Sequence, residues 1–367
     1  MAQREFPDNR GKVLEAVDIV DVVGDSVSLK RKGSEYVGLC PFHDDHKPSM
    51  YVVPGKQIFH CFSCGAGGNA IDFVMRHHGL DFREALRALA DKAGIELEQA
   101  RRSGGTESAS GSGVSRGELS DANAMAQSFF RAIFDHPQHG AVARTSAERR
   151  GISNEMIERF GIGASPDRFD GLLQTAQKRG VDQRVLLEAG LLKRSERGKV
   201  YDGFRNRLMF PIRDAMGRVI AFGARRLDEE DNPKYLNSPE SDLFNKSRAL
   251  FGLFEATKAI QRERTAIVTE GYTDVVACHQ AGVEHAVAAL GTAFTKEHAR
   301  VLKRLCDRVV LLFDGDEAGQ RAADRAIEAF FAEPIDVQIV VLPDGADPDD
   351  MLKQEGGRER FLALVAR

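Results

Sequence analysis

The stretch VVLLFDGDEAG, residues 309–319, decides the fold class of this chain. Five apolar residues in a row are typical of a strand that is buried on both faces, as in a parallel sheet. The run ends on Asp314 and Asp316, and open α/β sheets place their ligands at the carboxyl ends of such strands. Because two carboxylates this close together repel each other, we expect a positive charge between them.

The last third of the chain alternates strand-like and helix-like segments. Strands are expected at 265–270, 285–290, 308–314 and 336–342, and helices at 274–280, 296–305 and 320–331. Strands separated by helices of this length form βαβ units with right-handed crossovers, so a parallel sheet is predicted. The first strand ends on Glu270, and neighbouring parallel strands would bring Glu270 to the same edge as Asp314 and Asp316.

Three carboxylates at one sheet edge, with no basic residue between them, make a hard-oxygen site suited to Mg²⁺ or Mn²⁺. One or two such ions would activate a nucleophilic oxygen and stabilise a leaving pyrophosphate. Asp347 and Asp349 follow the fourth strand and are candidates for a second metal shell. The alternative is that these acids are helix N-caps and exposed turn residues, as Asp316 would be before a helix that starts near Gly319.

A second group of candidate ligands lies in residues 38–68, GLCPFHDDHKPSMYVVPGKQIFHCFSCGAGG. Two pairs of soft ligands, each separated by two residues, are Cys40 with His43 and Cys61 with Cys64. Four such ligands suit one tetrahedral zinc ion and leave no open position, so a structural site is expected. His46 and His60 are alternatives to His43, which matches the two-residue gap. The competing interpretation is three buried thiols and a surface histidine.

The composition favours a multidomain globular protein. The chain has 367 residues, a formal net charge of −4 and 42% hydrophobic residues, so we expect two or three domains. No apolar run is long enough for a membrane span, and no signal peptide opens the chain. Three of the five cysteines lie within 25 residues, which favours a metal site in a reducing cytoplasm over a secreted disulfide framework.

Residues 101–119, RRSGGTESASGSGVSRGEL, are rich in glycine and serine and predict a flexible linker. The segment between this linker and the acidic sheet concentrates basic residues. They are Arg205, Arg207, Arg225, Arg226, Lys234, Lys246 and Arg248. For any one of them ordinary surface charge is the simpler explanation. As a group beside a metal site, they indicate a phosphate-rich polymer or a nucleoside triphosphate.

Six motifs in this order resemble the bacterial-type replicative DNA primases. The segment GLCPFH…HCFSCGAGGNAIDF is similar to the N-terminal zinc-binding domain of that family. FPIRD, PKYLNSPE, EGYTDVVA, ALGTA and FDGDEAG are similar to its RNA polymerase core, which contains a TOPRIM fold. The resemblance implies an α+β and α/β multidomain protein, in which a zinc ribbon domain precedes a mixed α/β core with a TOPRIM-type parallel sheet.

The resemblance also implies where the domains lie. The expected segments are a zinc-binding domain at 1–100, a linker at 101–119, the basic N-terminal part of the core at 120–254, a TOPRIM domain at 255–345 and the start of a C-terminal helical segment at 346–367. Members of the family continue with a helicase-binding domain. The sequence is therefore expected to be a fragment or a truncated homologue that lacks the docking domain for the replicative helicase.

The activity that the resemblance implies is template-directed synthesis of a short RNA primer from ribonucleoside triphosphates on single-stranded DNA. It would take place in the bacterial cytoplasm, at the replisome, with no membrane partner. Cys40, His43, Cys61 and Cys64 would ligate one structural Zn²⁺ and help engage the template. Glu270, Asp314 and Asp316 would hold one or two catalytic Mg²⁺ or Mn²⁺ ions. Arg150, Arg225, Lys234 and Lys246 would contact nucleotide phosphates and template.

Two other classes of function are weighed against this one. The first is another TOPRIM enzyme, a topoisomerase or a nuclease. A topoisomerase needs a tyrosine nucleophile on a separate DNA-gate domain, and none of the five tyrosines lies in an obvious domain of that kind. The second is a non-catalytic nucleic-acid-binding protein, against which the intact acids Glu270, Asp314 and Asp316 argue. The sequence contains no G-x-x-x-x-G-K-[ST] loop, so a fused primase-helicase is not supported.

Overall fold

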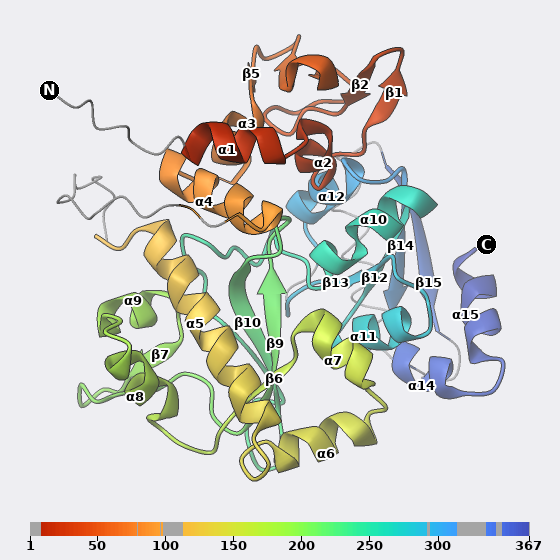
Figure 1. The fold of residues 1–367 in the computed structure, drawn as a ribbon. Helices are drawn as coiled ribbons and strands as arrows, with labels where there is room; N and C mark the ends of the chain where they lie inside the picture. Colours follow the sequence, from red (N-terminus) through yellow and green to blue (C-terminus); the bar gives the residue numbers. More distant parts are fainter. Residues whose placement is uncertain are drawn as a thin grey trace, which may run out of the picture. The chain divides into compact units, whose positions relative to one another are not determined.

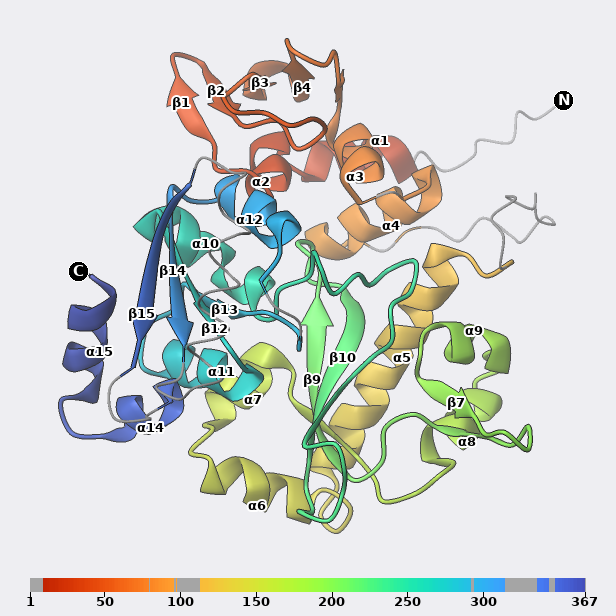
Figure 2. The same cartoon turned by 180° about the vertical axis from the view of Figure 1, so that it is seen from behind.

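The computed structural model describes residues 9–78, 80–95, 97, 113–291, 294–313, 335–342 and 347–366. The chain divides into two compact units, Met1–Gly113 and Val114–Arg367, and each is treated by itself (Figures 1 and 2). The predicted helix at 320–331 and most of the predicted linker lie outside the described residues. Among the helices that the structure describes, none combines the length and the apolarity that a transmembrane segment needs.

Unit 1 contains an antiparallel sheet. Its strands, in spatial order, are β1 (Lys30–Lys32), β2 (Glu35–Gly38), β3 (Met50–Val53), β4 (Ile58–Cys61) and β5 (Gly67–Gly68). The helices of the unit are α1 (Asn9–Ala16), α2 (Ile19–Gly24), the short η1 (Pro54–Lys56), α3 (Ala70–His78) and α4 (Phe82–Ala93). Along β4, Phe59 and Cys61 are buried whereas Ile58 and His60 are exposed, which is the pattern of a strand with one face on a core.

The predicted linker ends earlier than residue 119. Helix α5 (Arg116–Asp135) follows the N-cap Ser115, whose side chain accepts a hydrogen bond from the Glu118 N–H. The Glu118 carboxylate in turn accepts from the Ser115 N–H at 2.8 Å, and Leu119 is buried. The predicted end of the linker at residue 119 is therefore wrong, because Ser115 and Glu118 form a capping box that starts a helix inside the glycine- and serine-rich stretch.

The first part of unit 2 is an antiparallel sheet covered by helices. The sheet order is β11 (Tyr235–Asn237), β10 (Val219–Arg226), β9 (Arg207–Arg213) and β6 (Gly163–Ser165), and β7 (Leu192–Arg194) and β8 (Val200–Asp202) form a separate hairpin. The helices here are α5, α6 (Ala141–Arg149), α7 (Asn154–Phe160), α8 (Gly171–Lys178) and α9 (Gln183–Glu188). Phe130 of α5 packs edge to face on Phe222 of β10, with ring centroids 5.2 Å apart, so α5 covers this sheet.

The second part of unit 2 confirms the predicted parallel sheet. The strand order is β13 (Ala286–Ala288), β12 (Thr265–Thr269), β14 (Arg308–Phe313) and β15 (Asp336–Val341), and every pairing is parallel. The helices of this part are α10 (Leu253–Glu263), α11 (Tyr272–Gln280), α12 (Lys296–Lys303), α14 (Pro348–Lys353) and α15 (Gly357–Val365). The described elements match the strand and helix alternation that the sequence predicts.

The apolar run of β14 is buried on both faces, as predicted. Val309, Leu311 and Phe313 belong to one core cluster, which also holds residues of α10 and α12. Val310 and Leu312 belong to a second cluster, which also holds residues of α11, α14 and α15. Alternate side chains of one strand therefore enter two different cores, so a continuous apolar run is required here.

Helices α14 and α15 lie next to β15 in both views of the molecule (Figures 1 and 2). Met351, Phe361 and Val365 of these helices share a core cluster with Ile267 and Val310 of the sheet. The described residues after 346 form the helices α14 and α15, and these helices are part of the α/β layer. A boundary at 345/346 would cut one hydrophobic core in two.

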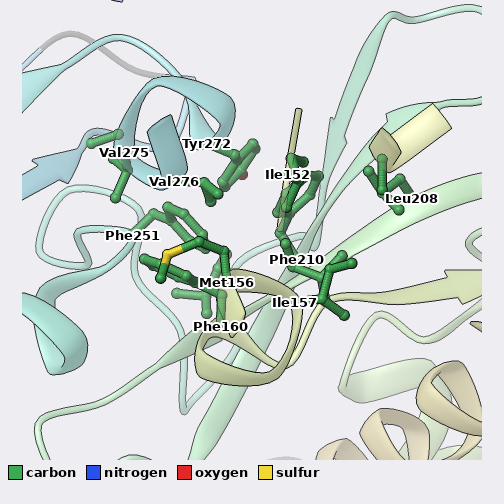
Figure 3. Close-up of a cluster of buried hydrophobic side chains, with 14 of the residues drawn as sticks. Ile152, Met156, Ile157, Phe160, Leu208, Phe210, Phe251, Tyr272, Val275 and Val276 are labelled. Carbon is green, nitrogen blue, oxygen red and sulfur yellow. The ribbon is translucent and has the colours of Figure 1, made fainter. Parts of the chain in front are cut away.

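The two sheets of unit 2 are joined by a hydrophobic cluster in which α7, β9 and α11 meet (Figure 3). The Tyr272 ring of α11 stacks on Phe210 of β9 with centroids 5.3 Å apart and meets Phe251 edge to face at 4.8 Å. Gly223 of β10 permits this packing, because a Cβ atom there would lie 2.2 Å from the Tyr272 ring. The cluster thus sets the position of the start of α11 relative to the antiparallel sheet.

Candidate zinc centre, acidic sheet edge and phosphate-binding groove

The structure brings the four predicted zinc ligands together in unit 1. One ligand atom from each of Cys40, His43, Cys61 and Cys64 lies within 4.8 Å of the others. The Sγ atoms of Cys40 and Cys64 are 3.8 Å apart, and Cys61 Sγ lies 4.0 Å from His43 Nδ1. A tetrahedron with metal–sulfur bonds of ~2.3 Å has edges of about 3.8 Å, so this spacing fits a zinc ion.

The two other histidines that the sequence leaves open lie outside this group of four. His46 Nε2 is 3.4 Å from an oxygen of Asp44. His60 points to the exposed face of β4, where its ring packs against Phe62. His60 cannot join Cys61 in the metal site, because consecutive residues of a strand face opposite sides of it.

Asp45 lies close to two of the candidate zinc ligands, Cys40 and His43. Its carboxylate accepts hydrogen bonds from the Cys40 N–H at 2.7 Å and from the Ser49 hydroxyl at 2.7 Å, and it lies 3.7 Å from His43 Nε2. Burial acts to raise the pKa of Asp45, but these hydrogen bonds outweigh it and the pKa is lowered. A carboxylate on the second nitrogen of a ligand histidine orients the ring and increases its basicity.

The thiols of the group have different tendencies to ionise. Burial raises the pKa of Cys40 well above its usual range. Burial also acts to raise the pKa of Cys61, but a hydrogen bond with Ser49 and hydrogen bonds from backbone N–H groups outweigh it and lower this pKa to about 7. A buried Cys40 thiolate therefore needs a cation beside it, which a zinc ion would supply.

Replacing Asp45 with asparagine is expected to weaken zinc binding about 10- to 100-fold, because His43 and Cys40 lose the charge that orients them. Competition with a zinc-binding dye would measure the affinity. Asp44→Asn is the matched control, since Asp44 is the neighbouring acid, its side chain is 58% exposed and it lies beside His46. Equal zinc affinities for the two variants would contradict the role of Asp45.

An exposed aromatic group lies near the zinc ligands. The Phe62 side chain is 73% exposed and meets the rings of Tyr51 at 5.3 Å and His60 at 4.9 Å. Lys32 donates a hydrogen bond to the Tyr51 hydroxyl at 2.8 Å, which raises the pKa of Lys32. Aromatic rings beside cations suit single-stranded nucleic acid. No short stretch of the sequence reveals this group, because Lys32 lies on β1, Tyr51 on β3, and His60 and Phe62 on and just after β4.

The described strands define the acidic edge of the parallel sheet. Strands β12 and β14 are parallel neighbours in which Val268 pairs with Leu311, so their carboxyl ends share an edge. Glu270 is exposed directly after β12. Asp314 and Asp316 lie outside the described residues, and the position of Asp314 in the sequence is the one after the last residue of β14. The strand order that the three-acid hypothesis requires is thus present.

The two later acids have partners within the protein. Asp347 is the N-cap of α14, and its side chain accepts a hydrogen bond from the Asp350 N–H at 2.7 Å. Asp349 is half-buried and accepts a hydrogen bond from Lys353 Nζ at 2.6 Å. Burial raises the pKa of Asp349, and Lys353 opposes that shift. Asp347 thus has the geometry of a helix N-cap, which is the alternative that the sequence left open.

A groove of about 650 Å³ lies between α6 and the end of β10. Its basic lining residues are Arg149, Arg150, Arg225, Arg226 and Lys234. Three of the four residues that the resemblance assigns to phosphates and template, Arg150, Arg225 and Lys234, therefore meet in one place, together with Arg226 of the wider basic group. The fourth, Lys246, is in the turn before α10, with its carbonyl oxygen 2.9 Å from His298 Nε2, and is not among the groove's lining residues. Arg149, which is adjacent to Arg150, lines the groove but is not among the residues predicted from the sequence.

The cations of the groove are close enough to affect one another. Burial, and after it the charge of Arg225, lowers the pKa of Arg150. Arg225 donates a hydrogen bond to the Tyr235 hydroxyl and lies over the Tyr235 ring, 5.0 Å from its centroid. Lys234 lies 5.8 Å from the same ring centroid. Crowded, partly buried cations of this kind are suited to bind an anion such as phosphate.

The rim of the groove is attached to the helix that follows Glu270. The Tyr235 hydroxyl lies 3.5 Å from Thr273 Oγ1 at the start of α11. The Tyr272 hydroxyl donates a hydrogen bond to Asn237 Oδ1. Strand β11 therefore touches the start of α11, and the cationic groove and the acidic sheet edge are parts of one region.

Three parts of the chain match known protein families. Residues 7–104 match the CHC2 zinc finger, residues 129–257 match the N-terminal domain of the DNA primase catalytic core, and residues 267–352 match a Toprim-like family. These segments contain, in order, the Cys/His group, the antiparallel sheet and the parallel sheet. The first match and the geometry of the Cys/His group together identify a structural zinc site.

Proteins similar to nearly the whole chain carry the name DNA primase. The DNA primase of Halalkalibacterium halodurans is 43% identical over 364 residues, which are 98% of this chain and 59% of that protein. The DNA primase of Pseudomonas putida is 44% identical over 360 residues, which are 96% of this chain and 53% of that protein. The chain thus spans a little more than half the length of these relatives.

Solved structures of DNA primases are also similar to this chain. The structure of the zinc-binding and RNA polymerase domains of the Aquifex aeolicus primase matches with a TM-score of 0.65 and 34% identity, over 98% of this chain and 85% of that one. A DnaG primase catalytic domain bound to ssDNA matches with a TM-score of 0.63 and 40% identity, over 68% of this chain and 78% of that one. With its zinc site, its two sheets and its relatives considered together, the chain belongs to the DNA primase family.

Proposed function

We propose that this chain is a DNA-directed RNA polymerase that makes short RNA primers on single-stranded DNA. The observation that carries the proposal is the contact of β11 with the start of α11, which joins the cationic groove to the acidic sheet edge. A polymerase needs both regions together, because cations bind the template and nucleotide phosphates while acids hold the ions at the reacting phosphate.

The residues that would hold the catalytic ions are Glu270, Asp314 and Asp316. One or two Mg²⁺ or Mn²⁺ ions bound there would activate the attacking hydroxyl of the primer and stabilise the leaving pyrophosphate. The parallel pairing of β12 with β14 supports this assignment, since it directs both strand ends to one edge. Glu270 is exposed to solvent, and a magnesium ion bound by few carboxylates keeps several water ligands.

The groove would take the phosphates of the template strand and of the incoming ribonucleoside triphosphates. Arg150, Arg225 and Lys234 line it, and a similar catalytic domain is described as bound to ssDNA. Lys246 remains a predicted nucleotide contact outside the groove. In unit 1 the half-buried ring of Tyr51 and the exposed ring of Phe62 would stack on template bases.

The wider setting follows from the family. We place the activity in the bacterial cytoplasm, where replication needs RNA primers. A replicative helicase is the protein partner that the resemblance implies, and we assign it no docking surface on the described residues.

The decisive experiment is incubation of the protein with single-stranded DNA and labelled ribonucleotides, with and without added Mg²⁺. A primase is expected to make short, template-dependent RNA only when Mg²⁺ is present. A nuclease would shorten the DNA, a topoisomerase would change the linking number of a supercoiled plasmid, and a simple binding protein would do neither. Absence of RNA product from a folded, zinc-loaded protein would contradict the proposal.

Replacing Lys234 with alanine is expected to lower the slope of log Kd against log salt concentration for single-stranded DNA by about one, because one phosphate contact is lost. Fluorescence anisotropy with a labelled oligonucleotide at several salt concentrations would measure the slope. Lys258→Ala is the matched control, since Lys258 is an exposed lysine on α10 that does not line the groove. A Lys234→Ala slope equal to that of wild type would count against the groove.

A further inference from the structure

We propose that His298 is a positioning residue for Lys246. Its side chain holds the turn of residues 245–249, named here the Lys246 turn, against the start of α12, and so fixes the point from which the Lys246 ammonium reaches a nucleotide. The inference rests on the proposed function, in which Lys246 contacts the phosphates of an incoming ribonucleoside triphosphate. It assigns a role to a histidine that is completely buried and does not line the groove.

The Lys246 turn leads into the parallel sheet beside the acidic edge. Phe251, which follows the turn, donates its N–H to the Ala288 carbonyl oxygen at 2.8 Å, and the Ala288 N–H donates to the Phe251 carbonyl oxygen at 3.1 Å. Ala288 of β13 in turn pairs with Thr269, the residue before Glu270. A cation carried by this turn is therefore well placed for the triphosphate of a nucleotide bound at the acidic edge.

Hydrogen bonds within the turn use its N–H groups. The Asn245 carbonyl oxygen accepts from the Arg248 N–H at 3.1 Å and from the Ala249 N–H at 3.0 Å. The Asn245 Oδ1 atom accepts from the Ser247 N–H at 2.9 Å. The carbonyl groups of Lys246, Ser247 and Ala249 need partners from another element, because polar backbone groups that are partly buried are costly to leave unpaired.

The start of α12 supplies these partners. His298 Nε2 lies 2.9 Å from the Lys246 carbonyl oxygen and 3.2 Å from the Ala249 carbonyl oxygen. The Thr295 hydroxyl donates to the Ser247 carbonyl oxygen at 2.6 Å. Two side chains of one helix turn thus bind three carbonyl groups, and the backbone that carries Lys246 is attached directly to α12.

The hydrogen bonds of the His298 ring determine which nitrogen carries the proton. The Thr295 N–H donates to His298 Nδ1 at 3.1 Å, within the capping box that begins α12. Nδ1 is therefore an acceptor, and the neutral ring donates from Nε2 to the turn. Burial lowers the pKa of His298, which favours this neutral form. A capping box needs only an acceptor at this position, so the donor on Nε2 is the feature that serves the Lys246 turn.

The test is extension of an annealed RNA primer on single-stranded DNA, with kcat and the KM for ribonucleoside triphosphate determined separately. His298→Leu removes the donor at similar size. It is expected to raise KM about three- to tenfold and to leave kcat within about twofold of wild type, because nucleotide binding is weakened while the acidic edge is unchanged. His298→Gln offers both an acceptor and a donor, and is expected to keep KM within about twofold of wild type.

His279→Leu is the matched control. His279 is a second buried histidine of unit 2, on α11, and its Nε2 lies 2.9 Å from the carbonyl oxygen of Ala286. This hydrogen bond goes to β13 and not to the Lys246 turn. Loss of the imidazole at this position is expected to lower stability without changing the KM for the nucleotide. Near-ultraviolet circular dichroism would check that each variant is folded.

A double-mutant cycle tests whether His298 acts through Lys246. Lys246→Ala alone is expected to raise KM about tenfold, because one charge-assisted phosphate contact is lost. In the Lys246→Ala background, His298→Leu is expected to change KM less than about twofold. Thr295→Val leaves His298 in place but removes the hydroxyl that binds the Ser247 carbonyl, and is expected to raise KM about threefold.

The possible outcomes separate the inference from the proposed function. An unchanged KM in both His298→Leu and Thr295→Val, an equal rise in His279→Leu, or an undiminished effect in the Lys246→Ala background would overturn the inference and leave the proposed function intact. A wild-type KM for Lys246→Ala would overturn the inference together with the assignment of Lys246 to nucleotide phosphates. Absence of RNA synthesis by the folded wild-type protein would instead overturn the proposed function on which the inference rests.

Discussion

Replacing Glu270 with glutamine is expected to reduce RNA primer synthesis by about a hundredfold or more, while binding of single-stranded DNA stays within about twofold of wild type. Glutamine has nearly the shape of glutamate but lacks its charge, so the sheet and the start of α11 should be unaffected. The lost charge belongs to the edge where β12 and β14 end together. Labelled primer formation at several Mg²⁺ concentrations would measure the defect.

The control for this prediction lies at the other end of the same strand. Glu263 is exposed at the end of α10, just before β12 begins, so it lies at the edge away from Glu270. Glu263→Gln is expected to make primers at close to the wild-type rate. If Glu270→Gln made primers as fast as Glu263→Gln, the acidic edge would not be the site of the reaction.

Replacing Cys61 with serine is expected to remove about one equivalent of zinc per chain and to unfold unit 1. Cys61 is fully buried, is within 4.0 Å of His43 Nδ1 and accepts a hydrogen bond from the Cys64 N–H at 3.5 Å. A structural zinc ion contributes about 10 kcal/mol or more to the folding of a small module, and a serine hydroxyl is a poor substitute for a thiolate ligand. Elemental analysis and hydrogen exchange of residues 9–95 would show both effects.

Unit 2 provides the control for the zinc prediction. Cys306 is a buried cysteine between α12 and β14, outside the Cys/His group. Cys306→Ala is expected to retain the full zinc content. Exchange protection in unit 2 should persist in Cys61→Ser, because unit 2 has hydrophobic core clusters of its own. Unchanged zinc content in Cys61→Ser would refute the ligand assignment.

Some features of the chain are readable from short stretches. The apolar run that becomes β14 requires two buried faces, and the paired spacings around Cys40 and Cys61 require one ion. Both signals depend on residues that are neighbours in the sequence, so local chemistry is enough to interpret them. The start of α5 is also encoded by neighbouring residues, because Ser115 and Glu118 form a capping box. The glycine-rich residues before Ser115 nevertheless make the whole stretch look like a linker.

Other features depend on residues that are far apart in the sequence. The groove combines Arg150 after α6 with Arg225 at the end of β10, and Lys246, which looks equivalent in the sequence, lies elsewhere. Asp349, which the sequence predicts as part of a second metal shell, also accepts a hydrogen bond from Lys353 and lines a small cavity with Arg150. The charge of a side chain alone does not predict these contacts, because they depend on which side of a packed helix or strand the side chain faces.

The sequence by itself determined the parallel sheet, the Cys/His zinc segment and the family, because each rests on residue types at fixed local spacing, whereas the structure selected His43 over His46 and His60. Only the tertiary structure decided which cations share a groove, that β11 joins this groove to the acidic edge, and that α14 packs against the turn that carries Arg150. The physical reason is that the contacts of β11 with α11 join residues 35 and 38 positions apart in the sequence, whose meeting depends on how the two sheets pack through the cluster around Tyr272.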